Sequence, residues 1–309
     1  MSDSIFKHYT VMKKEVVDSL DCYDSEKIFV DCTLGGGGHS EEILKRISPK
    51  GRLISFDVDD DAIIFASERL KNYKNLTIVK GSYKDIDIHL KNLGIEKITG
   101  GIIFDLGASY HQLTNYERGF SFLHDSKLDM RFDMEQEFSA YDIINKYSEN
   151  ELVEIFSKYG EEHFSKRIAK AIVSKRPIKT TTELANLIIK STPSVKSKIH
   201  PATRVFQALR IEVNSELLNF ENTLNKVINL LDVGAIISVL SFHSLEDRIS
   251  KQFMKKYSLN CRCDKNIPVC TCGGKMLELL TKKPIIATDE EISLNPPSRS
   301  AKLRSARRI

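Results

Sequence analysis

The stretch Asp31-Cys-Thr-Leu-Gly-Gly-Gly-Gly-His-Ser40 follows the apolar residues Ile28-Phe29-Val30, and a second apolar run ends on Asp57. Glycines let a ligand approach the backbone closely, and a helix that begins beside them presents its free N–H groups to that ligand. An acidic residue at the end of the next strand can accept hydrogen bonds from ribose hydroxyls. The pattern therefore predicts a nucleotide-type pocket; the alternative is a glycine-rich turn that only reverses the chain.

The composition is that of a globular protein long enough for two domains. The chain has 309 residues, of which 41% are hydrophobic and 28% charged, and a net charge of +4, which argues against disordered and fibrous proteins. Its apolar runs are far shorter than the roughly 20 residues of a membrane helix, and the N-terminus has no apolar core of signal-peptide length. We therefore expect a cytoplasmic protein without membrane contact, in which Cys22 and Cys32 are reduced, buried thiols.

The first third of the chain alternates strand-like and helix-like segments. Strands are predicted over 27–31, 52–57, 76–80 and 101–106, and helices over 40–47, 61–73 and 85–93. The fourth strand is apolar throughout, as expected of a strand buried on both faces. Such alternation predicts an α/β fold with a parallel, doubly wound sheet, in which ligands lie beyond the carboxyl ends of the strands.

The alternation stops after Asp105, and the next buried strand is predicted only at 234–242. A structureless loop of that length is not expected in a compact protein. Helices are predicted over 149–159, 162–175, 181–190 and 203–231, and Thr180 and Glu183 have the spacing of a capping box. We therefore predict a helical substrate-recognition domain, residues 114–217, inserted into a catalytic domain formed by 1–113 and 218–309.

Polar residues follow the predicted fourth strand in Asp105-Leu-Gly-Ala-Ser-Tyr-His-Gln112. Asp105, Ser109 and Gln112 are the hydrogen-bond acceptors of this segment. In enzymes that methylate the exocyclic amine of a base, acceptors at this position hold the amine and aim its nitrogen at the methyl donor. The alternative is that Asp105 only caps a turn that Gly107 permits.

Two later segments interleave aromatic residues with charges: Arg118-Gly-Phe-Ser-Phe122 and Leu128-Asp-Met-Arg-Phe-Asp133. Their phenylalanines suit stacking on an unpaired base, and Arg118 and Arg131 suit phosphate contacts. A half-buried extended segment whose arginines pair with local acids is the favoured interpretation of most of these residues.

Two polar features lie near the C-terminal end. His243 follows the predicted fifth strand, where it can move a proton, contact the substrate backbone or be satisfied by a neighbouring carbonyl. From Arg299 the chain contains five cations and no acid. This segment is interpreted either as a phosphate-contacting tail or as a solvated basic tail.

Four thiols lie within a dozen residues, in Cys261-Arg-Cys263 and Cys270-Thr-Cys272. In a reducing compartment this clustering favours a tetrahedral thiolate site for zinc over disulfides. The Cys-x-Cys spacing is less usual than Cys-x-x-Cys. We therefore hold a structural zinc ion, bound by these four cysteines, as a hypothesis.

Nine sequence blocks carry a family resemblance. They are His8-Tyr-Thr-Val-Met12, Gly35-Gly-Gly-Gly-His-Ser40, Arg118-Gly-Phe-Ser-Phe122, Leu128-Asp-Met-Arg131, Lys158-Tyr-Gly-Glu-Glu162, His200-Pro-Ala-Thr-Arg204, Phe206-Gln-Ala-Leu-Arg-Ile211, Asn214-Ser-Glu-Leu217 and Ser241-Phe-His-Ser-Leu-Glu-Asp-Arg248. Through them the chain resembles the bacterial small-subunit ribosomal RNA cytosine-N(4)-methyltransferases of the MraW type. The resemblance implies a class I S-adenosylmethionine-dependent methyltransferase fold, a Rossmann-like doubly wound sheet with an inserted all-helical domain.

The resemblance also implies the reaction and its site. S-adenosylmethionine would be the donor, and the target a cytidine in the decoding region of 16S ribosomal RNA, within the small ribosomal subunit. Asp105 and Ser109 would orient the target amine. The implied donor-binding residues are Gly37, Gly38 and His39 near the methionine end, Asp57 on the ribose, Tyr83 as an aromatic contact, and Asp105 and Gln112 near the adenine and the reaction centre.

Alternatives to this function remain. The family usually reads Ser-Pro where this chain has Tyr110-His111, so a diverged paralogue that methylates another RNA or DNA amine is one. A ribosome-assembly factor that binds the donor without catalysis is a second. A nicotinamide-dependent dehydrogenase expects Gly-x-Gly-x-x-Gly, and Ser40 occupies the last glycine position of that pattern when it starts at Gly35.

Overall fold

The structure is a computed structural model that describes residues 10–193, 200–263 and 271–309. It divides into two compact units. The sheet unit comprises Met1–Gly107 and Leu217–Ile309, and the helical unit comprises Ala108–Glu216. Within the described residues, no helix combines the length and the apolar character needed to cross a membrane.

The sheet unit contains a mixed sheet with the strand order β3-β2-β1-β4-β5-β8-β6. Five neighbouring strands are parallel: β3 (Leu76–Lys80), β2 (Arg52–Asp57), β1 (Ile28–Asp31), β4 (Gly101–Asp105) and β5 (Ile236–Ser241). The antiparallel strands are β8 (Lys302–Arg308), which pairs with β5, and β6 (Leu277–Leu279) and β7 (Ile285–Ile286), which pair with β8. The chain reverses its strand order between β1 and β4, which places their carboxyl ends at a topological switch point.

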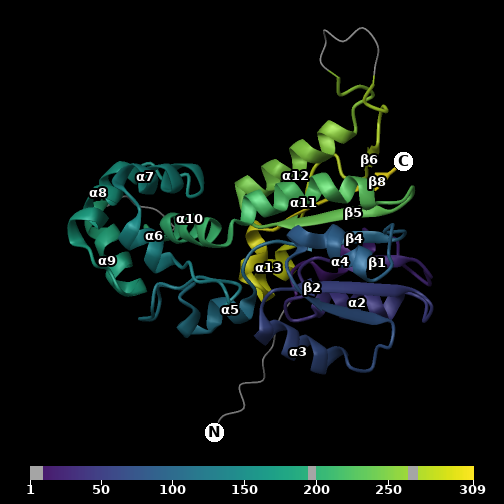
Figure 1. The fold of residues 1–309 in the computed structure, drawn as a ribbon, viewed down its shortest axis with the longest axis horizontal. Coiled ribbons are helices and arrows are strands. Elements are labelled where there is room, and N and C mark those ends of the chain that lie inside the picture. Colours follow the sequence, from purple (N-terminus) through teal and green to yellow (C-terminus); the bar gives the residue numbers. More distant parts are fainter. Residues whose placement is uncertain (1–9, 194–199, 264–270) are drawn as a thin grey trace. The chain divides into compact units, whose positions relative to one another are not determined.

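Helices cover both faces of this sheet because its parallel strands are apolar on both sides. The helices of the sheet unit are α1 (Lys13–Asp18), α2 (Gly38–Arg46), α3 (Asp60–Leu70), α4 (Ile86–Asn92), α11 (Glu216–Leu230, apart from its first residue), α12 (Ser244–Tyr257) and α13 (Asp289–Leu294), with short 3-10 turns at Tyr83–Asp85 and Pro296–Ser300. Figure 1 shows α11 and α12 on one face and α2 and α3 on the other.

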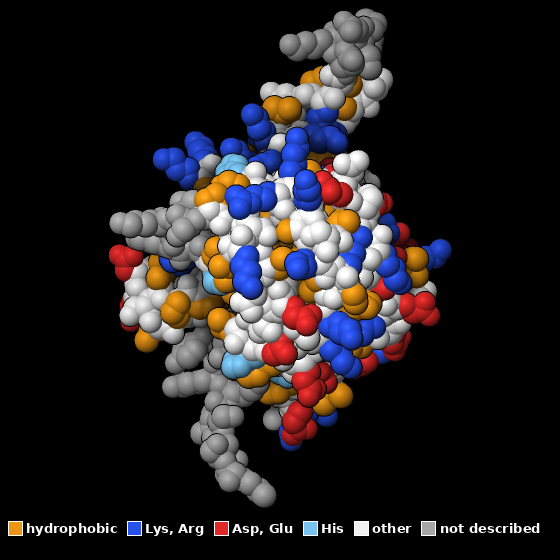
Figure 2. Space-filling view, turned by 90° about the vertical axis from the view of Figure 1, so that its left-hand side faces the viewer, with side chains coloured by type: hydrophobic (Ala, Val, Ile, Leu, Met, Phe, Trp, Pro, Cys, Tyr) orange, Lys and Arg blue, Asp and Glu red, His pale blue; other side chains and the backbone are white. Residues whose placement is uncertain are grey.

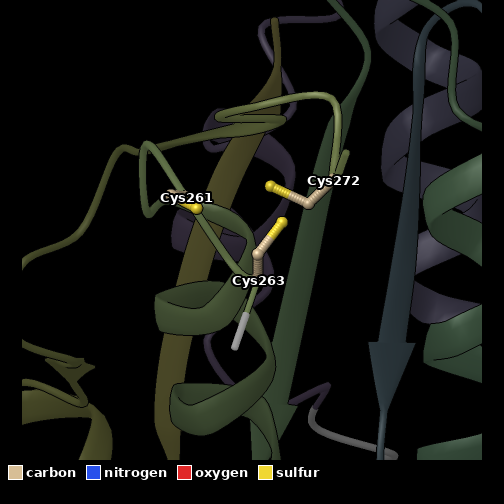
Figure 3. Close-up of side chains that lie close together, drawn as sticks. All are labelled: Cys261, Cys263 and Cys272. Atoms are coloured by element: carbon tan, nitrogen blue, oxygen red, sulfur yellow. The ribbon is translucent and has the colours of Figure 1, made fainter. Parts of the chain in front are cut away.

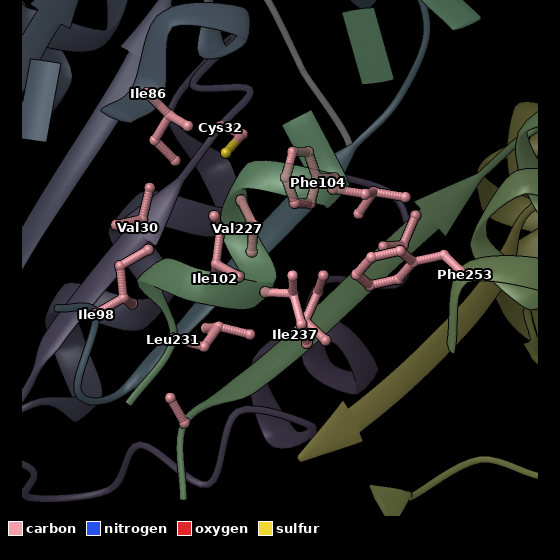
Figure 4. Close-up of a cluster of buried hydrophobic side chains, with 14 of the residues drawn as sticks. Val30, Cys32, Ile86, Ile98, Ile102, Phe104, Val227, Leu231, Ile237 and Phe253 are labelled. Carbon is pink, nitrogen blue, oxygen red and sulfur yellow. The ribbon is translucent and has the colours of Figure 1, made fainter. Parts of the chain in front are cut away.

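Alternate residues of the central strands pack into two separate hydrophobic cores, one on each face of the sheet. On one face, Val30, Ile102 and Ile237 pack with side chains from α4, α11 and α12 (Figure 4). Their chain neighbours Phe29 and Ile103 point to the opposite face, where they pack with α1, α2 and α3. The sheet is thus doubly wound, as the strand and helix pattern predicts.

The helical unit is built from α5 (Tyr110–Thr114), a 3-10 turn (Tyr116–Arg118), α6 (Ala140–Lys146), α7 (Glu149–Lys158), α8 (Ser165–Lys175), α9 (Thr181–Ser191) and α10 (Ala202–Asn214). It has its own core, in which Phe156, Ile168 and Leu209 are fully buried. The predicted capping box is present at α9: Glu183 N–H donates to Thr180 Oγ1 over 3.3 Å, and Thr180 N–H donates to Glu183 Oε2 over 3.2 Å.

The single helix predicted over 203–231 is wrong, because the chain forms two helices there. Helix α10 ends at Asn214, Ser215 adopts a left-handed conformation with φ 50°, and α11 begins at Glu216. The Asn214 side chain accepts from Phe132 N–H over 2.7 Å and donates to Met130 O over 2.8 Å. These bonds to a distant segment hold the end of α10, and the local sequence contains no glycine or proline to mark the break.

The interpretation of the basic C-terminus as a solvated tail is also wrong, and phosphate contacts of this segment stay a prediction. Residues Lys302–Arg308 form β8, which lies between β5 and β6 in the sheet. Leu303 and Ala306 are buried, and Arg304 is only 8% exposed. Arg304 Nε donates to Asp247 Oδ1 of α12 over 2.7 Å, so this cation is paired inside the protein.

Candidate active site

The glycine turn joins β1 to α2 and is tied to two neighbouring elements. Gly37, with φ 74°, is the N-cap of α2, and Gly38 is the first residue of that helix. Gly35 N–H donates to Asp57 Oδ2 over 2.8 Å, and Arg69 Nη1 of α3 donates to Gly36 O over 2.9 Å. The turn is therefore held at the carboxyl edge of the sheet, with the free N–H groups of α2 beside it.

Asp57, at the end of β2, organises this turn through both carboxylate oxygens. Besides the bond from Gly35, its Oδ1 accepts from Asp59 N–H over 3.0 Å. Burial raises its pKa to about 6, although the bonds from the Asp59 and Gly35 amides act in the opposite direction. A carboxylate has about four acceptor positions, so Asp57 can still accept hydrogen bonds from a ribose.

His39 and Asp105 lie against each other at the same edge. His39 is 3% exposed, its Nδ1 lies 3.3 Å from Asp105 Oδ2, and its Nε2 lies 3.1 Å from Val11 O. Burial alone would lower the pKa of His39, but the hydrogen bond and the negative charge of Asp105, with a further contribution from Asp31, raise it. The imidazole therefore fixes the orientation of the Asp105 carboxylate at the end of β4.

Asp31 lies beside the glycine turn, and the sequence analysis did not single it out. It is fully buried, and its Oδ2 accepts from Ser40 Oγ over 2.7 Å, while Ser40 Oγ lies 2.9 Å from Ser55 Oγ. Burial raises its pKa, and the bond from Ser40 opposes that rise. Its position at the end of β1, which matches those of Asp57 on β2 and Asp105 on β4, is the sequence signal that identifies it.

Thr33 connects the glycine turn to Asp105. Its N–H donates to Asp31 Oδ1 over 3.0 Å, and its Oγ1 accepts from Asp105 N–H over 2.8 Å. The carboxylates of Asp31 and Asp57 and the backbone N–H of Asp105 are thus linked to one short turn. Asp31 and Asp105 are joined through Thr33, and Asp57 is joined through Gly35.

Tyr83 follows β3 and packs within the sheet unit. Its ring meets Phe104 edge to face, with 5.8 Å between centroids and 88° between planes. Phe104 directly precedes Asp105 in β4, so Tyr83 buttresses the strand that carries this carboxylate. Its predicted contact with the adenosyl group stays a prediction.

Ser109 and Gln112 belong to the helical unit, where they cap α5. Gln112 N–H donates to Ser109 Oγ over 3.2 Å, and Ser109 N–H donates to Gln112 Oε1 over 2.9 Å. Their side-chain oxygens therefore already satisfy the first turn of this helix. Their roles in orienting the amine and in binding the donor stay predictions.

The aromatic and basic segments of the helical unit form internal contacts. Arg131 Nη2 lies 2.7 Å from Asp129 Oδ2, and Arg118 Nη2 donates to Arg131 O over 3.0 Å. Phe120 stacks on Phe132 with 5.5 Å between ring centroids. These contacts support the interpretation of a half-buried segment whose arginines are paired locally.

His243 is the N-cap of α12. Its Nδ1 accepts from Glu246 N–H over 3.5 Å, and its Nε2 lies 2.9 Å from Glu246 Oε1. The ring therefore lies against Glu246, and among the described residues no hydrogen bond joins its Nε2 to the backbone carbonyl that one interpretation of the sequence expects. The ring begins the helix that follows β5.

Three of the four predicted metal-binding cysteines lie together. The Sγ atoms of Cys261, Cys263 and Cys272 are all within 4.8 Å of one another (Figure 3). Cys270, the fourth predicted ligand, lies outside the described residues. Cys22 and Cys32 are buried, reduced thiols, as expected.

Comparisons of the sequence with known proteins identify its relatives. Residues 5–309 match the family model described as the MraW methylase family. The chain is 50% identical to "Ribosomal RNA small subunit methyltransferase H" of Caldicellulosiruptor bescii, over 99% of this chain and 100% of the relative. It is 48% identical to the protein of the same name from Clostridium botulinum strain Loch Maree, over 98% and 99%.

Among solved structures, a "putative rRNA-methylase" from Clostridium thermocellum aligns with a TM-score of 0.47 and 12% identity, over 97% of this chain and 98% of that one. The family match spans nearly the whole sequence, and the central sheet is doubly wound, as the sequence predicts. The chain belongs to the MraW methylase family, and it has the class I S-adenosylmethionine-dependent methyltransferase fold.

Proposed function

We propose that this chain transfers a methyl group from S-adenosylmethionine to the exocyclic nitrogen of a cytidine in the decoding region of 16S ribosomal RNA. The observation that carries this proposal is the full-length identity of 48% and 50% to relatives named as ribosomal RNA small subunit methyltransferases. The resemblance of the sequence blocks to cytosine-N(4)-methyltransferases supports the choice of base and position.

The residues at the carboxyl edge of the sheet suit this donor. Gly37 and Gly38 begin α2, whose first N–H groups lie beside the turn, and Asp57 has acceptor positions left for ribose hydroxyls. In our proposal His39 lies near the methionine end of the donor, and Tyr83 and Gln112 provide contacts for its adenosine.

Asp105 is proposed to orient the target amine. When bound, S-adenosylmethionine would supply an electrophilic methyl group on its sulfonium. The N–C bond would form as the C–S bond breaks, S-adenosylhomocysteine would leave, and the proton of the amine would pass to solvent. Asp105 accepts a hydrogen bond from the amine, and His39 and Thr33 hold its carboxylate and its backbone in position. Ser109 is proposed as a second acceptor. Positioning of amine and methyl in line would be the main contribution to the rate.

The helical unit is proposed to recognise the RNA. Helix α8, with the sequence Ser-Lys-Arg-Ile-Ala-Lys-Ala-Ile-Val-Ser-Lys, contains four cations and no acid. Its Lys166, Arg167 and Lys170 are exposed, whereas Ile168 and Ile172 face the core. Figure 2 shows Lys and Arg side chains spread across the face that it displays, with Asp and Glu gathered toward its lower edge. An exposed basic helix suits contacts with phosphates.

Nucleoside mass spectrometry of ribosomal RNA tests this function. RNA from cells that lack this chain should lose N(4)-methylation of one cytidine, and the purified protein with S-adenosylmethionine should restore it on small subunits. Methylation of a different nucleotide would identify a diverged paralogue. A protein that binds the donor but never methylates RNA would be an assembly factor, and either result would overturn the proposal.

Donor binding is expected to weaken as the pH falls through the pKa of Asp57. With that pKa at about 6, most of the carboxyl group is protonated at about pH 5, where it is a poorer acceptor for ribose hydroxyls. The affinity for S-adenosylhomocysteine should therefore be about tenfold lower at about pH 5 than at about pH 7.5. Calorimetry at both pH values measures this difference.

Asp57→Asn is the matched control for the pH experiment. Asparagine keeps an acceptor oxygen for the Gly35 amide but places its NH2 group against Asp59 N–H, so the affinity should be lower at both pH values. Because asparagine does not titrate, the variant should nevertheless lose most of the pH dependence. His39, whose pKa is also raised, is unchanged in it. If the variant kept the full dependence of the native protein, another group would be responsible.

A further inference from the structure

A cluster of thiols lies in the segment that connects α12 to β6, and the proposed methyl transfer does not use these thiols. Cys261 and Cys263 follow the end of α12, and Cys272 precedes β6. Figure 3 shows the side chains of Cys263 and Cys272 pointing toward each other, with Cys261 beside them. All three are reduced thiols, and their Sγ atoms lie within 4.8 Å of one another.

Backbone amides are directed at two of these sulfur atoms. Arg262 N–H donates to Cys272 Sγ over 3.1 Å, and Thr271 N–H donates to Cys263 Sγ over 3.3 Å. The cluster is formed by two arms, residues 261–263 and residues 271–272. Each of these bonds runs from a backbone N–H of one arm to a sulfur atom of the other. Hydrogen bonds of this kind stabilise the negative charge of a thiolate and orient it toward a shared ligand.

The two arms are also held together by contacts that do not involve the sulfur atoms of the cluster. The Arg262 guanidinium donates to the carbonyl oxygens of Cys272 and Gly274. The same guanidinium lies 5.0 Å from the centroid of the Tyr257 ring, at the end of α12. Met276 N–H donates to Tyr257 O over 2.9 Å. The protein's own contacts therefore position the thiols, and a bound ion would need to order the two arms only a little further.

We propose that Cys261, Cys263 and Cys272 bind a zinc ion. Thiolates on one tetrahedral zinc, with Zn–S bonds of about 2.3 Å, lie roughly 3.8 Å apart, which agrees with the spacing in the cluster. A disulfide requires sulfur atoms only about 2.05 Å apart and would leave the third thiol unused. Three soft sulfur ligands favour zinc over magnesium or calcium, and the ion would fasten the segment that follows α12 to the one that precedes β6.

Elemental analysis of the full-length protein tests this site. Protein produced with zinc in the medium and purified without chelator should contain about one equivalent of zinc. Cys261→Ser, Cys263→Ser and Cys272→Ser should each lose most of it, and Cys261 is exposed, so its replacement leaves the core intact. Cys22→Ser, which alters a buried thiol of the same unit outside the cluster, should retain the metal. Less than roughly a tenth of an equivalent in the native protein would overturn the proposal.

Cobalt substitution gives a second readout that does not depend on methylation. Metal-free protein titrated with Co²⁺ should develop the intense thiolate-to-cobalt charge-transfer absorption and the visible bands of a tetrahedral site. Cys263→Ser should weaken both. If the native protein developed nothing but the faint bands of octahedral, oxygen-bound cobalt, these sulfur atoms would not be ligands.

Discussion

Asp105→Ala is expected to lower the rate of methyl transfer by about a hundredfold or more. The carboxylate lies at the end of β4, with Thr33 at its backbone N–H and the His39 ring 3.3 Å from Oδ2. Alanine keeps the strand but removes the acceptor that we propose for the target amine, and an amine that is not aimed at the methyl group reacts slowly. Single-turnover rates with saturating donor and small subunits measure the effect.

Two controls separate orientation from folding in this experiment. Asp105→Asn keeps the shape and one acceptor oxygen, so its rate should lie between those of the native protein and Asp105→Ala. The far-UV circular dichroism and the unfolding temperature of Asp105→Ala should show that the fold is intact, because Asp105 is itself one of the expected donor-binding residues. A near-normal rate in a folded Asp105→Ala protein would remove this carboxylate from the mechanism.

The parts of the fold that can be predicted from the sequence are those determined by residues close together in the chain. Strands 52–57 and 76–80 are predicted with the bounds that the structure has, because apolar runs bounded by turn residues define them. Asp57 and Asp105 are identified as candidate site residues because they end such runs. Since parallel strands present their carboxyl ends at one edge, the sequence also predicts that these groups share an edge of the sheet.

The parts that sequence analysis missed depend on distant partners. Residues 302–308 have the composition of a basic tail, and their pairing with β5, β6 and β7 makes them a strand, on which Arg304 is bonded to Asp247. The break at Ser215 is stabilised by bonds from Asn214 to residues of another segment. Asp31 ends a predicted strand as Asp57 and Asp105 do, but its contacts with Ser40 and Thr33 are visible only in the structure.

Gly38→Ala is expected to have the second large effect, because the first turn of α2 has no room for a methyl group. A Cβ at this position would lie 1.7 Å from Thr10 Oγ1 and 2.9 Å from Thr10 Cβ. Either Thr10 or the first turn of α2 must move. Overpacking of this kind costs about 1–3 kcal/mol, and because the displaced groups adjoin the proposed donor site, the affinity for S-adenosylmethionine, measured by calorimetry, should fall by about tenfold or more.

The steric cause can be tested by removing the other partner of the clash. Thr10→Gly removes the three nearest atoms that a Cβ at Gly38 would meet, so the double variant should bind the donor more tightly than Gly38→Ala alone. Gly94→Ala is a further control: its φ of 69° strains an alanine, but a Cβ there meets nothing within 4 Å, so the donor affinity should be unchanged. If Thr10→Gly gave no rescue, the clash with Thr10 would not be the cause of the loss. The loss would then come from a change in α2 itself, in the position of its first N–H groups.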